Sequence, residues 1–166
     1  MSELIDLVNS NGEIAQRAIE RDDADKYNDL YMQIVIAVVK NGRGEVLVHQ
    51  RAKTKRVNPG DIDHVCGGIL SGETPEDAAI REAKEEVGIK PDKLEIVRQG
   101  INTYGRYCYL LSGFSEAQPG SELNPLEVEW AAYYPVETLQ AKNESGEFTF
   151  VDGFFEDIEL VAAQAR

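Results

Sequence analysis

The chain has 166 residues and a formal net charge of −13 at pH 7, and 42% of its residues are hydrophobic. This length suits one domain with a sizeable core, and the composition is ordinary for a globular protein. The acidic balance argues against a broad surface for nucleic acid or for an anionic membrane. A protein of this charge that handles phosphates must therefore neutralise them locally, with metal ions and a few basic side chains.

Two features of the chain bear on its compartment. Cys66 and Cys108 are too few for a disulfide framework. The N-terminus lacks a basic segment followed by an apolar one, and no run is long enough to span a bilayer. We expect a cytoplasmic protein, a monomer or a homodimer, that binds neither membranes nor nucleic acid.

The first predicted element is a β-hairpin. Residues 4–8 alternate as a strand does, Asn11-Gly12 supplies a turn, and residues 13–19 return as the second strand. Residues 20–28 are polar and charged, which indicates a connecting loop or a single helical turn. The hairpin is thus expected to lie apart from the strands that follow.

The central strands are predicted next. Residues 32–39 form a continuous apolar run rich in β-branched side chains, which indicates a buried strand. After a Gly-containing turn, residues 45–51 predict a second strand, residues 52–63 a loop, and residues 64–67 a further short strand. The later predicted elements are strands at 94–98, 106–114 and 128–134, a short helix at 135–142 and a C-terminal helix at 154–163.

Residues 67–89, GGILSGETPEDAAIREAKEEVGI, carry the strongest helix signals in the chain. Thr74 is typical of an N-cap, Pro75 of the first helical position, and Asp77 of the acid that completes a capping box. Gly88 is typical of the residue that ends a helix. These signals predict about three and a half turns of helix.

Three carboxylates follow one face of this helix. Glu82, Glu85 and Glu86 stand at i, i+3 and i+4, where like charges repel by roughly 0.2–0.5 kcal/mol per pair. A divalent cation would turn that repulsion into attraction, and carboxylate oxygens suit Mg²⁺ or Mn²⁺. A solvated acidic face is the alternative for an arbitrary run of this kind.

The spacing around these carboxylates resembles the signature of the Nudix hydrolases. The pattern G-x5-E-x7-R-E-A-x-E-E-x-G-I, from Gly67 to Ile89, matches that signature without gaps. The resemblance implies an α/β fold, the Nudix α/β/α sandwich with a mixed β-sheet. It also implies a single Nudix domain over residues 1–166, with the N-terminal β-hairpin and its connector in residues 1–30 and the signature in residues 67–89.

As a family, Nudix enzymes cleave a nucleoside diphosphate linked to another group, by water attack at phosphorus. The resemblance makes Glu82 and Glu86 the firmest ligands of Mg²⁺ or Mn²⁺, with Glu85 and the Gly67 carbonyl as further ligands. Nucleoside di- and triphosphates are the leading substrates. Nucleotide sugars, dinucleotide polyphosphates and NADH are alternatives.

Arg81 and Glu73 would support catalysis from beside the metal, because the arginine would hold a carboxylate in its rotamer. The catalytic base has two candidates in this family resemblance. One is Glu85 in the helix. The other is Glu127, in the loop before the strand at 128–134, for which a solvated acidic loop is the alternative reading.

The only basic cluster in the sequence precedes the signature and consists of Arg51, Lys53, Lys55 and Arg56. We expect Arg51, Lys55 and Arg56 to supply contacts to substrate phosphate, with solvated side chains on a loop as the alternative for at least half of them. His49 and His64 have no partners at metal-ligand spacing, and we expect both to be structural or surface residues. Tyr104, Tyr107 and Phe114 could stack on a base or line a groove, but core packing is the more common use of such residues.

The segment Arg51-Ala52-x-x-Lys55-x-x-x-Pro59-Gly60 resembles Nudix proteins related to isopentenyl-diphosphate isomerase. Cys66 lies seven residues before Glu73, where those isomerases carry a catalytic cysteine, so isomerisation of isopentenyl diphosphate is the alternative function. Gly68 stands where they have a histidine ligand, residues 30–33 lack their other histidine, and the helix keeps all its carboxylates. A ligand-sensing module is a third possibility, but it would be expected to have lost carboxylates.

Overall fold

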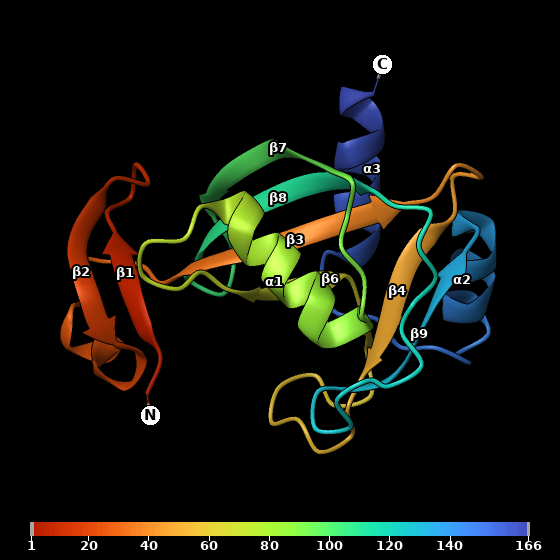
Figure 1. The fold of residues 1–166 in the computed structure, drawn as a ribbon, viewed down its shortest axis with the longest axis horizontal. Coiled ribbons are helices and arrows are strands. Elements are labelled where there is room, and N and C mark those ends of the chain that lie inside the picture. The colour runs from red at the N-terminus through yellow and green to blue at the C-terminus, as the bar shows by residue number, and fades with distance from the viewer. Residues whose placement is uncertain (1, 166) are drawn as a thin grey trace.

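The computed structural model describes residues 2–165, which form two β-sheets and a set of helices (Figure 1). The strands are β1 (Leu4–Val8), β2 (Ile14–Glu20), β3 (Gln33–Lys40), β4 (Val46–Arg51), β5 (Ile62–Asp63), β6 (Val65–Gly68), β7 (Lys93–Ile101), β8 (Tyr107–Phe114) and β9 (Val128–Tyr134). The helices are the 3-10 helix η1 (Arg21–Lys26) and the α-helices α1 (Pro75–Val87), α2 (Val136–Glu144) and α3 (Phe154–Gln164).

The larger sheet has seven strands and mixed direction. Its main path runs β5-β4-β3-β8-β7, with β6 paired to β3 and β9 paired to β4. Strands β3 and β8 are parallel, and every other pairing in this sheet is antiparallel. Strands β1 and β2 form the predicted hairpin as a separate sheet, to the side of the larger one in Figure 1.

Strand β3 is apolar from Ile34 to Val39 because helices cover both faces of the sheet. Val35 and Val39 point into a core that contains Ala79 and Ala83 of α1. Val38, which alternates with them, points into the opposite core, with residues of α2 and α3. Figure 1 shows α1 and α3 on opposite sides of this sheet. The structure thereby confirms the predicted α/β architecture with a mixed sheet.

Helix α1 begins and ends at the residues that its sequence indicates. Thr74 is the N-cap, and its Oγ1 accepts a hydrogen bond of 3.1 Å from the Asp77 amide. Gly88 ends the helix at φ +71°, a left-handed conformation that glycine adopts without a steric penalty. The helix packs against β6 and β3, which fixes the direction of its carboxylates relative to the sheet.

Two predicted segments were wrong in their details. The expected loop at 52–63 ends in β5, where His49 of β4 pairs with Asp63, and the following strand runs over 65–68 rather than 64–67. The strand predicted at 94–98 is longer in the structure, where β7 runs from Lys93 to Ile101. Within residues 2–165, no helix has both the length and the apolar character needed to cross a membrane.

Candidate active site

Arg81 is the centre of the hydrogen-bond network on α1. Its Nε and Nη2 donate to the two carboxylate oxygens of Glu73, at 2.8 and 3.0 Å, in the paired geometry that arginine and carboxylates favour. Nη2 also donates to the Gly68 carbonyl at 2.7 Å, and Nη1 donates to Glu82 at 2.6 Å. Glu73 in turn accepts a bond of 2.9 Å from the Leu70 amide. The arginine therefore joins the loop before α1, strand β6 and one carboxylate of the helix.

Glu82 lies directly over Gly67 of β6. A Cβ atom on Gly67 would overlap the Glu82 carboxylate, so the glycine is required for this approach. Burial raises the pKa of Glu82, and the hydrogen bond from Arg81 opposes that rise. The first glycine of the signature thus has a defined structural purpose, which is to admit a carboxylate onto the backbone of the strand.

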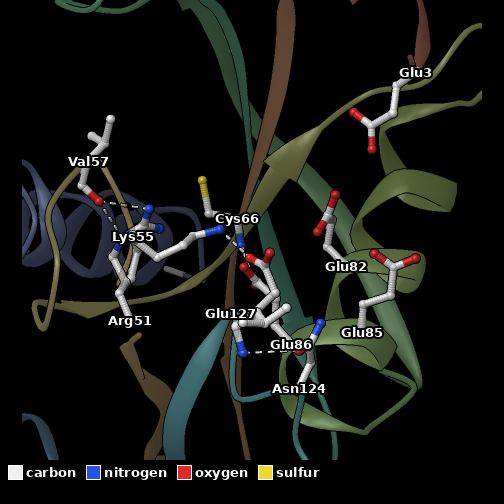
Figure 2. Close-up of polar contacts among 12 residues, drawn as sticks. Glu3, Arg51, Lys55, Val57, Cys66, Glu82, Glu85, Glu86, Asn124 and Glu127 are labelled. Carbon is white, nitrogen blue, oxygen red and sulfur yellow. Dashed lines mark hydrogen bonds and ion pairs between the residues drawn. The ribbon is translucent and has the colours of Figure 1, made fainter. Parts of the chain in front are cut away.

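Glu86 is the most buried of the three carboxylates, with 6% of its surface exposed. Its Oε2 accepts a hydrogen bond of 3.1 Å from the Cys66 amide, drawn as a dashed line in Figure 2. Burial raises the pKa of Glu86 well above its ordinary value, and the neighbouring carboxylates Asp63 and Glu82 add to the rise. The site therefore holds an acidic group whose negative charge is poorly compensated by the surrounding protein.

Glu85 differs from its two neighbours. Its side chain is 58% exposed, and the Arg81 guanidinium lies 3.5 Å from its Oε2. Figure 2 shows that the side chains of Glu82, Glu85 and Glu86 leave α1 in different directions. Among the residues that the structure describes, no three acidic, histidine or cysteine side chains already form a metal-binding cluster. The shared helix face brings these carboxylates near one another without making them converge.

The basic loop between β4 and β5 is held by protein contacts. Lys55 forms an ion pair with Glu127, which connects this loop to the one before β9 (Figure 2). Arg51 donates to the Val57 carbonyl at 3.0 and 3.2 Å and to Asp63 at 3.1 Å, and its side chain is only 15% exposed. Arg56 is exposed. Arg51 thus shapes the loop itself, a use that the sequence did not indicate.

A cavity of about 830 Å³ opens on the face of the sheet opposite α1. Cys66 and Arg51 contribute to its wall beside the carboxylate helix, while Tyr104 and Asp157 contribute from the β7–β8 loop and α3. In Figure 2 the Cys66 sulfur points away from Glu86, and burial raises the pKa of this thiol well above its ordinary value. The thiol is therefore neutral at pH 7.

Both histidines were predicted to be either structural or surface residues, and the structure shows that they are structural. His49 and His64 are buried, and burial lowers the pKa of His49 to about 3 and that of His64 to about 4. The His64 ring stacks on Phe154 with ring centres 4.0 Å apart, and its Nε2 lies 3.0 Å from the Phe154 carbonyl. His64 therefore helps to hold the start of α3 against the sheet.

The acidic part of the cavity was not among the residues predicted from the sequence. Asp157 is partly buried in the first turn of α3, between the core residues Phe154 and Val161. An acid at a helix position whose i−3 and i+4 neighbours are apolar was the available signal. Asp63 was not predicted as a site residue because it lay within a predicted loop.

Comparison with known proteins places the chain in a family. Residues 30–154 match the NUDIX domain. A Nudix hydrolase of Deinococcus radiodurans is 29% identical over 87% of this chain and 86% of its own length. An uncharacterized Nudix hydrolase of Streptomyces coelicolor is 31% identical, over 90% of this chain and 82% of its own length. An isopentenyl-diphosphate Delta-isomerase of Corynebacterium diphtheriae is 42% identical, but over only 34% of this chain and 31% of its own length.

Solved structures agree with the sequence comparison. A crystal structure from Deinococcus radiodurans superposes with a TM-score of 0.72 at 24% identity, covering 95% of this chain and 99% of that one. The NUDIX domain of Shewanella oneidensis NrtR, solved with ADP ribose, superposes with a TM-score of 0.64 at 13% identity, covering 89% and 100%. These two likenesses concern the fold. With the matched domain and the full-length relatives, they show that this chain belongs to the Nudix hydrolase family.

Proposed function

We propose that this Nudix hydrolase cleaves the phosphoric anhydride of a nucleoside diphosphate-containing substrate, by water attack at phosphorus, with Mg²⁺ or Mn²⁺. The observation that carries the proposal is the set of carboxylates on α1 beside the backbone of strand β6. Glu82 lies over Gly67, and Glu86 is buried against the Cys66 amide.

The residues present fit a hard divalent cation. Glu82, Glu85 and Glu86 offer only oxygen donors, the type that Mg²⁺ and Mn²⁺ prefer. The raised pKa of the buried Glu86 indicates a carboxylate that lacks enough positive charge around it. Glu82, Glu86, Glu85 and the Gly67 carbonyl would hold the cation. When bound, it would neutralise phosphate oxygens and lower the pKa of a coordinated water.

The chain's own residues would orient the reaction. Arg81 donates to Glu82 and Glu73 at once, so it would keep the Glu82 carboxylate in one rotamer. Glu85 is exposed and has only a long contact to Arg81, which leaves its carboxylate available to take a proton from water. Glu127 is the second candidate for this base. Its ion pair with Lys55 would have to open or to be shared with substrate.

Lys55 and Arg56 are the proposed phosphate contacts from the basic loop, with Arg51 beside them. Lys55 is held at Glu127, and Arg56 is exposed and free to reach a ligand. Arg51 lines the cavity but is already engaged by Val57 and Asp63, so its contact with phosphate would use the part of the guanidinium that those bonds leave open. We expect the substrate's phosphates between this loop and α1.

The proposal is tested by measuring phosphate and pyrophosphate release from nucleoside di- and triphosphates, nucleotide sugars, ADP-ribose and NADH. Each reaction is run with Mg²⁺, with Mn²⁺ and with chelator. Cleavage of one class that requires the metal is the expected result. If no nucleotide is cleaved under any of these conditions, the hydrolase assignment at this site is wrong.

Isomerisation of isopentenyl diphosphate is the second candidate function, because Cys66 lines the cavity and a segment of the chain matches an isomerase. The signature helix opposes it, since all the hydrolase carboxylates are present. Gly68 offers no side chain at the position where the isomerases have a histidine.

Cys66→Ala separates the two candidates. We expect this variant to keep nucleotide hydrolysis within about two-fold of the parent, because the Cys66 contact to Glu86 comes from the backbone amide and survives the change. Hydrolysis and conversion of isopentenyl diphosphate are assayed in both proteins, with a thermal melt to show that folding is retained. Loss of all activity in a folded Cys66→Ala protein would favour the isomerase.

A further inference from the structure

We infer that the cavity binds the base of the substrate and that Asp157 makes it prefer bases with an exocyclic amino group over their keto counterparts. This inference rests on the proposed function, and it names the substrate class for the same site. The volume of the cavity, about 830 Å³, falls within the range of small-molecule pockets and is large enough for a nucleoside. The argument depends on the distribution of charge and hydrogen-bonding groups along the cavity wall.

The wall of the cavity includes residues that neighbour the proposed reaction centre. Cys66 forms part of the wall there, and its amide holds Glu86 of α1. Arg51 and Asn58 contribute from the basic loop that we expect to contact phosphate. A nucleotide whose phosphates lie at α1 and this loop would therefore direct its nucleoside into the cavity.

The cavity wall also carries acidic side chains from α3. Asp152, Glu156 and Asp157, from the start of α3 and the turn before it, all line it. These carboxylates would repel a phosphate group, whereas they could accept hydrogen bonds from the N–H groups of a base. Tyr104 also lines the cavity and donates from its hydroxyl to Asp152 at 2.8 Å, which anchors the ring as a surface for stacking.

Asp157 is the acid that remains available to a ligand. Glu156 lies 3.7 Å from Arg98, and Asp152 accepts the Tyr104 hydroxyl. Across the described part of the chain, the Asp157 carboxylate has no hydrogen-bond or ion-pair partner, although it is partly buried. A buried carboxylate that is ionised can only accept hydrogen bonds. It would pair with the amino group of cytosine or adenine and repel the carbonyl of uracil or hypoxanthine at the same position.

The ionisation of Asp157 gives this preference a pH dependence. Burial raises the pKa of Asp157 to about 7, with Glu156 of the same helix and Asp63 of β5 adding to the rise and Arg98 of β7 opposing it. Cys108 of β8 also lines the cavity, but burial raises its pKa to about 12, so it stays neutral. Asp152 and Arg106 line it as well and carry opposite charges. The ionised fraction of Asp157 thus grows as pH rises through 7, and the preference for amino bases should grow with it.

The test compares pairs of substrates that differ in one group, CDP with UDP and ADP with IDP. We expect the parent protein to favour the amino member by about 10- to 100-fold in kcat/KM, the range for a hydrogen bond to a charged group. In Asp157→Asn the side chain offers both a donor and an acceptor, so the ratio should approach one. Glu159→Gln is the matched control, because Glu159 is exposed on the same helix and does not line the cavity.

Two further measurements, of pH dependence and of binding, complete the test. The CDP/UDP ratio should rise from pH 6 to pH 8 in the parent and stay flat in Asp157→Asn, since titration of the shared phosphates cancels in the ratio. Binding of CMP and UMP, measured by calorimetry, tests the preference without turnover. Equal binding and equal turnover of both members by the parent, or an unchanged ratio in folded Asp157→Asn, would overturn the inference. Preferential CMP binding without any hydrolysis would retain it and refute the proposed function.

Discussion

Glu86→Gln is expected to lower metal-dependent turnover by several orders of magnitude while the fold remains intact. The substitution removes the buried negative charge that we assign to the metal, and an amide oxygen is a much weaker ligand for Mg²⁺ than a carboxylate. The glutamine oxygen can still accept the hydrogen bond from the Cys66 amide, so the contact between α1 and β6 is kept. Steady-state kinetics across a Mg²⁺ titration measure the effect.

Stability should move in the opposite direction. The pKa of Glu86 is raised in the folded protein, so its ionised form at pH 7 opposes folding, and glutamine removes that opposition. We therefore expect a melting temperature equal to or above that of the parent. Glu144→Gln, the same change at an exposed position of α2, serves as the control for both measurements. Near-parental turnover in Glu86→Gln with Mg²⁺ would show that the metal assignment is wrong.

Gly67→Ala is expected to lower kcat/KM by about 10- to 100-fold, the range found for residues that orient metal ligands. The added methyl group would overlap the Glu82 carboxylate and force it away from β6. Arg81 would then lose the geometry of its bond to Glu82, while its paired bonds to Glu73 would remain. The apparent affinity for Mg²⁺ should fall with the activity, and both are read from the same titration.

The neighbouring glycine provides a matched control. A Cβ atom on Gly68 would meet the Arg21 guanidinium at 3.5 Å, an ordinary van der Waals distance, so Gly68→Ala should fit with little change. We expect it to retain most of the parental activity and affinity for Mg²⁺. An equal loss in both variants would mean that the approach of Glu82 to Gly67 does not matter for catalysis.

Much of the fold followed from local signals. Thr74 and Gly88 bound α1 because capping depends on residues a few positions apart. The continuous apolar run of β3 reflected burial on both faces of the sheet. Strand β5 was missed because two residues carry no periodicity, and its pairing with β4 is decided by tertiary contacts. The end of β7 was missed for the same reason, since its last residues pair with β8 across the sheet.

The candidate site also has a part that local sequence spacing indicates and a part that depends on tertiary contacts. The hydrogen bonds of Arg81 to Glu73 and Glu82 lie within one short segment, so fixed spacing could indicate them. The pairing of Lys55 with Glu127 joins loops that are 72 residues apart, and no local pattern reports it. The cavity is also assembled from distant segments, so Asp157 could not be connected with Cys66 before the fold was known. The roles assigned to the carboxylates and to the basic loop stay predictions.

The most direct test of the central claim is hydrolysis by metal-free protein in ¹⁸O-labelled water, using the nucleotide that the substrate panel identifies. We predict no cleavage in the presence of chelator, and cleavage when Mg²⁺ is restored. One ¹⁸O atom should then appear in a phosphate-containing product, because water attacks phosphorus. Cleavage that continues in chelator, or a product that contains no ¹⁸O in its phosphate groups, would contradict metal-dependent water attack at this site.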